Sequence, residues 1–342
     1  MNRRELLQLC ASIVGGLGIP GVSEEFVQAA PDSTSTLDES YLATGLVGMA
    51  QAKGWFDAHW GAAVLAGYYL CKENNLGEET VACIKSQLDA MIGLQPSQFG
   101  PIPKLAADET LIKRVPAALA PAVEGGLRAH GHAVIYASLS MKALRDAPQM
   151  AQATLINGLC GHISQIAKIK PAKPKGQSSY VDTQAMIEAT FDSLVRFQGL
   201  LGHPAVLRPN FTHIITHTEA LMSLDSMGYQ DLVKAGQVGH REHIAAPVPK
   251  FDPTAQPRVE HQASLAAVKN ASYWEDEANL KRWNRKWDMN DNPNGYWVAF
   301  GHLFKVLYSY HRLIKHIEDK EKVRLCSQIL LERYFNPDVQ GG

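Results

Sequence analysis

Several of the thirteen histidines in this chain of 342 residues lie at the start of apolar segments. His59 opens "HWGAAVLAGYYL", His132 opens "HAVIYASLSM", and His302 lies early in "GHLFKVLYSY". His213 and His217 share the segment "FTHIITHTEALMSL" and are four residues apart, so both face one side of a helix. Imidazole can ligate a metal or transfer a proton near neutral pH. The comparable positions therefore predict that these histidines share one site.

We expect His59, His132, His217 and His302 to reach a common cavity as catalytic residues. Tyr136 lies one helical turn from His132 and is the fifth catalytic candidate. His130 would diverge from His132 by about 200° if both were helical, so only His132 is expected to enter the cavity. The cofactor is unknown, and the histidines are compatible with a transition metal.

The metal-ligand candidates are His213 and His217, and we expect His213 to join the cavity only if a metal is bound. A pair of histidines four residues apart is weak evidence alone, because a zinc site needs a third ligand. The segment also lacks the HExxH pattern of zinc proteases. The competing interpretation is that each histidine is a hydrogen-bonded core residue. His240, His243, His311 and His316 are expected to lie at solvated helix ends or on the surface.

The elements that would position these residues are all helical. Apolar segments at residues 61–70, 133–144 and 297–310 have no polar face, so each should be buried on every side. Amphipathic segments follow at 78–92 and 320–334. No run alternates as a strand would. The sequence therefore predicts an all-α fold, an α/α toroid or helical barrel built from antiparallel helix pairs, with an orthogonal bundle as the alternative.

The helix boundaries expected outside those segments are 36–53, 58–72, 119–144, 148–168 and 181–201. Residues 31–342 are expected to form a single helical domain.

Residues 1–30 resemble a twin-arginine export signal. Arg3 and Arg4 precede a moderately apolar stretch, and the small residues of "VQA" end near Ala29. Four glycine and proline residues would disrupt an ordinary first helix here. We therefore expect the protein to be periplasmic or extracellular. No later run reaches the ~20 apolar residues of a membrane span.

The charge balance argues against a nucleic-acid partner and favours a small-molecule substrate. Lys and Arg total 33 against 34 for Asp and Glu, so no basic field surrounds the chain. Oligomeric state does not follow from the sequence.

Three segments are similar to the questin-oxidase-like family of helical proteins. They are "AHWGAAVLAGYYL", "AHGHAVIYASLSM" preceded by "LAPAVEGGLR", and "FTHIITHTEALMSL", in the family's order. The resemblance implies oxidative ring opening of aromatic polyketides in a Baeyer–Villiger-like reaction. Nicotinamide cofactors are not supplied outside the cytoplasm. The expected export therefore departs from what such a reaction needs as its reductant.

Three functions remain open at this point. The first is an exported, oxygenase-like oxidoreductase that acts on an apolar or aromatic small molecule in a histidine-lined cavity. The second is a glycan-directed lyase or hydrolase, in which His132 and Tyr136 would supply the acid–base pair. The third is a binding or structural protein whose histidines only pack.

Overall fold

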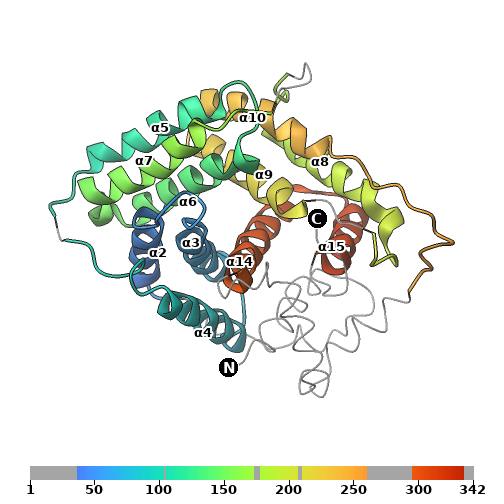
Figure 1. Cartoon of the computed structure of the whole chain (residues 1–342), viewed down its shortest axis with the longest axis horizontal. Coiled ribbons are helices and arrows are strands. Elements are labelled where there is room, and N and C mark those ends of the chain that lie inside the picture. Colours follow the sequence, from blue (N-terminus) through green and yellow to red (C-terminus); the bar gives the residue numbers. More distant parts are fainter. Residues whose placement is uncertain (1–36, 104, 173–177, 207–209, 260–294, 335–342) are drawn as a thin grey trace.

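A computed structural model describes residues 37–103, 105–172, 178–206, 210–259 and 295–334 (Figure 1). The export-signal prediction falls outside these residues. Over the described ranges the chain contains helices and no strand, which confirms the all-α prediction. No helix in this part of the protein is long and apolar enough to cross a membrane.

The α-helices are α2 (Ser40–Ala50), α3 (His59–Lys72), α4 (Glu78–Leu94), α5 (Arg114–Val123), α6 (His132–Asp146), α7 (Ala153–Ala167), α8 (Thr183–Val195), α9 (Phe211–Ser226), α10 (Gln230–Ile244), α14 (Gly295–Leu313) and α15 (Lys320–Arg333). Short 3₁₀ helices occupy Glu109–Lys113, Ala129–Gly131, Pro148–Met150, Arg196–Leu200 and Ile314–His316.

Four helices form the interior of the molecule. α3 contacts α14, α14 contacts α9, α9 contacts α6, and α6 contacts α3. The described side chains of α3, α6 and α14 are buried along most of their length, as their lack of a polar face predicts. α9 is also buried from Phe211 to Leu224, although its threonines and histidines interrupt the apolar pattern that marks the other three.

Most of the remaining helices cover these four, and α15 packs against α8. α2 and α4 contact α3, α5 and α7 contact α6, and α8 and α10 contact α9 (Figure 1). α4 shows why such a helix lies outside: Val81, Ile84, Leu88 and Met91 are buried at three- and four-residue spacing, and exposed residues lie between them. α2 approaches α3 so closely that a Cβ on Gly61 would lie 2.2 Å from the backbone nitrogen of Met49.

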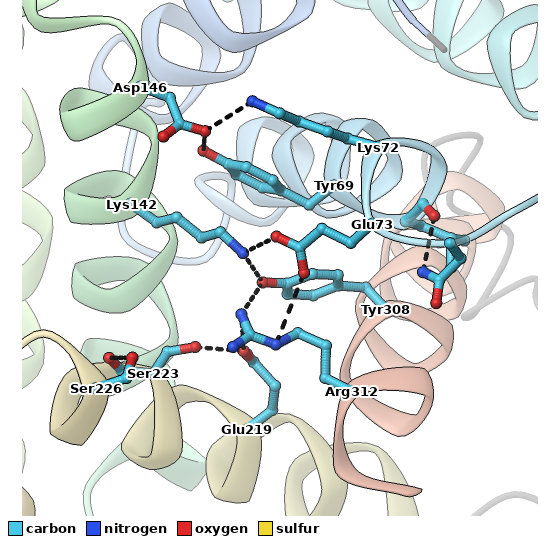
Figure 2. Close-up of polar contacts among 12 residues, drawn as sticks. Tyr69, Lys72, Glu73, Lys142, Asp146, Glu219, Ser223, Ser226, Tyr308 and Arg312 are labelled. Atoms are coloured by element: carbon cyan, nitrogen blue, oxygen red, sulfur yellow. Dashed lines mark hydrogen bonds and ion pairs between the residues drawn. The ribbon is translucent and has the colours of Figure 1, made fainter. Parts of the chain in front are cut away.

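The buried helices run in the same direction. His59 and His132 are the first residues of α3 and α6, His213 is the third residue of α9, and all three meet at one end of the interior. The opposite ends of the helices meet in a network of charged side chains (Figure 2). The shared direction therefore brings several helix N-termini to the histidines.

The charged network suits the C-terminal ends of helices. Lys142 of α6 donates to the carboxylate of Glu73 after α3 and, at 2.8 Å, to Tyr308 Oη. Arg312 of α14 donates to Tyr308 Oη at 2.8 Å and pairs with Glu219 of α9 at 3.2 Å (Figure 2). Cations are stabilised near the unpaired carbonyl groups at helix C-termini. Lys142 and Arg312 therefore compensate for the negative ends of the parallel helix dipoles that meet here.

One expected helix, at residues 119–144, is two helices. α5 ends at Val123, and Gly125 and Gly126 then adopt positive φ angles of 71° and 124°. A right-handed helix cannot pass through such angles, so the chain turns before α6 begins at His132.

Candidate functional site

Three buried helices bring His59, His132 and His302 together. One ring nitrogen of each lies within 4.8 Å of those of the other two. The Nε2 atoms of His59 and His132 are 2.7 Å apart, and the ring centroids of His59 and His302 are 4.9 Å apart. These are three of the four histidines that the sequence placed in a common cavity.

The fourth histidine at this cluster is His213, whereas the ring of His217 contacts those of His240 and His243. His213 Nε2 lies 3.2 Å from His132 Nε2, and its ring centroid lies 5.5 Å from that of His302. From the sequence, His213 was expected here only as the ligand of a bound metal. His217 is one turn further along α9, and its ring lies against Gly131, the residue before His132.

The tautomers of three of these rings follow from their neighbours. His59 Nδ1 lies 2.5 Å from the carbonyl oxygen of Phe56, and His132 Nδ1 contacts the carbonyl oxygen of Ala129. A carbonyl oxygen only accepts hydrogen bonds, which favours the tautomer with the proton on each Nδ1. In the neutral ring, Nε2 is then an unprotonated lone pair.

His213 has the same arrangement with a side-chain acceptor. Its Nδ1 lies 2.7 Å from Asn210 Oδ1, an oxygen that also accepts from the backbone N–H of His213 as the cap of α9. In each of these histidines the acceptor comes from the residue three positions earlier. Three Nε2 lone pairs therefore face one another at the start of three helices.

Burial keeps these histidines neutral. Desolvation, followed by the nearby Lys305, lowers the pKa of His132 to about 3 and that of His59 well below its usual value. Desolvation and then His132 do the same to the pKa of His213. Removing a charged group from water disfavours its charged form, so these three rings stay neutral.

Two further side chains complete this environment. Tyr136 is buried, and its Oη lies 2.7 Å from His59 Nδ1, so this candidate lies beside the cluster as predicted. Lys305 lies on α14, three residues after His302, and burial lowers its pKa to about 7. Lys305 was not among the candidates from the sequence, although its place in the apolar run "HLFKVLY" was a signal.

Aromatic side chains border the cluster where α3 begins. The Phe56 ring lies 4.8 Å from the His59 ring, and the Trp55 ring lies 5.4 Å from the His132 ring. Phe56 is 43% exposed, which is high for a phenylalanine. Phe56 therefore brings this edge of the cluster to the surface, a feature that the sequence did not indicate.

A second group of histidines lies beside the first. His217, His240 and His243 are buried, so the expected solvated end at His240 and His243 was wrong. α10 packs against α9, which places its histidines against His217 at ring-centroid distances of 5.6 and 5.4 Å. Both nitrogens of His217 lack a hydrogen-bond partner among the described residues.

This second group does not supply three free ligands. Tyr180 Oη lies 3.0 Å from His240 Nδ1, and Thr218 Oγ1 lies 2.8 Å from His240 Nε2, so both nitrogens of His240 are engaged. His243 Nε2 is 3.3 Å from the carbonyl oxygen of His130.

The remaining histidines considered in the sequence differ in their burial. His130 is exposed, and its ring stacks on His213 at 4.9 Å, which places it at the rim of the cluster. His311 is buried on α14, contrary to the surface prediction, because it continues the buried run of that helix; burial lowers its pKa to about 4. His316 is exposed as predicted.

The lone pairs can hold a metal ion. Two imidazole nitrogens at a zinc-like bond length of about 2.0–2.1 Å lie at most about 4 Å apart. The 2.7 and 3.2 Å separations around His132 lie within this limit, and the ring nitrogen of His302 lies within 4.8 Å of those of His59 and His132. Fixing Nδ1 on an oxygen also orients a ligand ring and makes its Nε2 more basic.

No family model matches the chain, and neither does any curated protein or solved structure compared with it, so the chemistry of this histidine cluster carries the functional argument.

Proposed function

We propose that this protein is a metal-dependent oxidoreductase whose ion is held by His59, His132 and His302, with His213 as a fourth ligand. One observation carries the proposal. The rings of His59, His132 and His213 each have Nδ1 beside an oxygen, and their Nε2 atoms approach one another at 2.7 and 3.2 Å. Burial opposes a charged imidazolium here, and a cation between the nitrogens would satisfy all of these lone pairs at once.

The ligand set favours a borderline or redox-active metal. Imidazole suits zinc, copper, iron and nickel, and the cluster described by these four rings contains no carboxylate. Neutral ligands leave the charge of the ion uncompensated. When bound, such an ion supplies Lewis acidity and, in the case of iron or copper, one-electron chemistry with dioxygen.

The chain's own residues fit an apolar substrate with a negatively charged or polar oxygen. The N-termini of α3, α6 and α9 meet at the cluster, and helix N-termini favour anionic groups. Phe56 and Trp55 offer ring faces beside the ligands. Tyr136 holds His59 on the side away from its Nε2. An aromatic substrate with an oxygen substituent satisfies both features.

Three parts of the proposal rest on the sequence. The resemblance to the questin-oxidase-like family supports oxygenase chemistry on aromatic compounds. The twin-arginine-like N-terminus supports export to the periplasm or beyond. The shared direction of α3, α6 and α9 supports a helical barrel with these helices as its inner layer.

The test combines metal content with oxygen uptake. Protein purified from its native compartment is analysed for metals, and oxygen consumption is followed with a panel of hydroxylated aromatic compounds. We expect about one ion per chain and substrate-dependent uptake. His132→Gln should abolish both, whereas His316→Gln, at an exposed position, should change neither.

Two results would count against the proposal. Protein that retains no transition metal, and binds none on titration, would favour the structural interpretation of the histidines. A bound ion without oxygen uptake on any aromatic compound would favour hydrolytic or lyase chemistry at the same ligands.

A further inference from the structure

The turn that precedes α6 has an unusual backbone. Ala129, His130 and Gly131 have φ angles of 40°, 53° and 83°, all in the left-handed region. Ala129 and His130 carry a Cβ, and such residues disfavour this region because Cβ crowds the following carbonyl. Two of them in succession indicate that the surroundings impose the conformation.

Neighbouring residues hold this turn in place. Arg128 Nε donates to the carbonyl oxygen of Ile169 at 2.8 Å. Arg128 Nη1 donates to the carbonyl oxygens of Ala122, at 3.2 Å, and Glu124. The chain before the turn is thus fixed to the loop after α5 and to the end of α7.

Each residue of the turn lies against a histidine. The Ala129 carbonyl accepts from His132 Nδ1, and the His130 ring stacks on His213. A Cβ on Gly131 would lie 2.7 Å from the His217 ring. A change of the turn to right-handed angles would redirect the Ala129 carbonyl and release His132 Nδ1.

We propose that the left-handed turn Ala129–Gly131 is a positioning element that is energetically coupled to metal binding at His132. The inference rests on the proposed metal site. The turn must be left-handed for Ala129 to fix the His132 tautomer. Whatever stabilises that conformation therefore tightens metal binding, and a bound ion stabilises the turn in return.

A series of substitutions at Ala129 tests the coupling with Co²⁺ as the probe. Glycine populates the left-handed region freely, whereas valine disfavours it more than alanine does. We expect Ala129→Gly to bind Co²⁺ more tightly than the wild type, by about fivefold, and Ala129→Val to bind about tenfold more weakly. Because Co²⁺ absorption reports ligand geometry, the valine variant should also change the visible spectrum of the bound ion.

Gly228→Ala supplies the matched control. Gly228 also has a positive φ, 88°, with nothing within 4 Å of an added Cβ, and it follows α9 at the end opposite the histidines. This variant should lower stability and leave Co²⁺ affinity unchanged. The full-length protein is used throughout.

The outcomes separate the two proposals. If the wild type binds Co²⁺ and the glycine variant has the same affinity and spectrum, the turn has only a structural role and the coupling is wrong. This comparison holds even if the valine variant fails to fold. If the wild type binds no Co²⁺ at all, the metal site itself is refuted and the coupling with it.

Discussion

Acidification from pH 7 to pH 5 should destabilise the fold through histidines that lie outside the metal site. His217, His240 and His243 are buried. Desolvation, followed by repulsion from neighbouring charges, lowers the pKa of His243 to about 3 and the pKa values of the other two well below the usual 6.5. All three therefore stay neutral in the folded protein at pH 5.

The sign of the effect follows from proton binding. The unfolded chain has histidine pKa values of about 6.5, so at pH 5 it binds more protons than the folded protein does. Stability is therefore lost as pH falls below about 6.5, and for His243 the loss continues to about pH 3.

The expected loss of unfolding free energy is large relative to the stability of a typical domain. A histidine that is protonated only in the unfolded chain lowers the free energy of unfolding by about 2 kcal/mol between pH 7 and pH 5. His243 alone should account for this amount, and the three residues together for about 6 kcal/mol. Typical domains have only about 5–15 kcal/mol of stability.

Denaturant unfolding followed by circular dichroism measures this loss at pH 7, 6 and 5, with a chelator present throughout. His243→Gln removes one titrating group but retains a donor for the His130 carbonyl, so its pH-dependent loss should be about 2 kcal/mol smaller. His316→Gln, at an exposed position, is the control and should show the full loss. An unfolding free energy that is equal at pH 7 and pH 5 would refute the buried, neutral state of these rings.

Three further outcomes are expected. Arg312→Met leaves the buried carboxylate of Glu219, 2% exposed, without its ion pair and should lower stability by about 3–5 kcal/mol in denaturant unfolding, whereas Arg324→Met, in an exposed pair, should cost less than about 1 kcal/mol. Tyr136→Phe removes a contact that orients a ligand ring, so Co²⁺ titration should show about tenfold weaker binding at unchanged stoichiometry. Mass spectrometry of protein from its native host should find a mature chain that begins near Ala30, and a mainly unprocessed chain would refute export.

The sequence predicted the fold class because burial leaves a simple pattern. Helices such as α3 and α6 have no polar face, so their place in the interior follows from composition alone. α9 does not follow this rule, because hydrogen bonds inside the helix satisfy some of its polar residues. Thr216 and Thr218, for example, donate to carbonyl oxygens four residues earlier. Periodicity cannot show such bonds.

The site was predicted in part, for a similar reason. The position of His59 and His132 at helix starts was visible in the sequence and correctly placed them together. The choice between His213 and His217 depended on how far along α9 the neighbouring helices meet, which spacing does not fix. His240 and His243 were misplaced because "GHREH" is polar, and only the packing of α10 on α9 shows that they are buried.

X-ray absorption of the protein with its retained ion tests the central claim most directly. The account predicts a first shell of about four imidazole nitrogens at about 2.0–2.1 Å. His213→Phe should remove one of these nitrogens, and His217→Phe, one turn away on the same helix, should remove none. A first shell without imidazole, or one that loses a nitrogen in the His217 variant but not in the His213 variant, would contradict the proposed metal site.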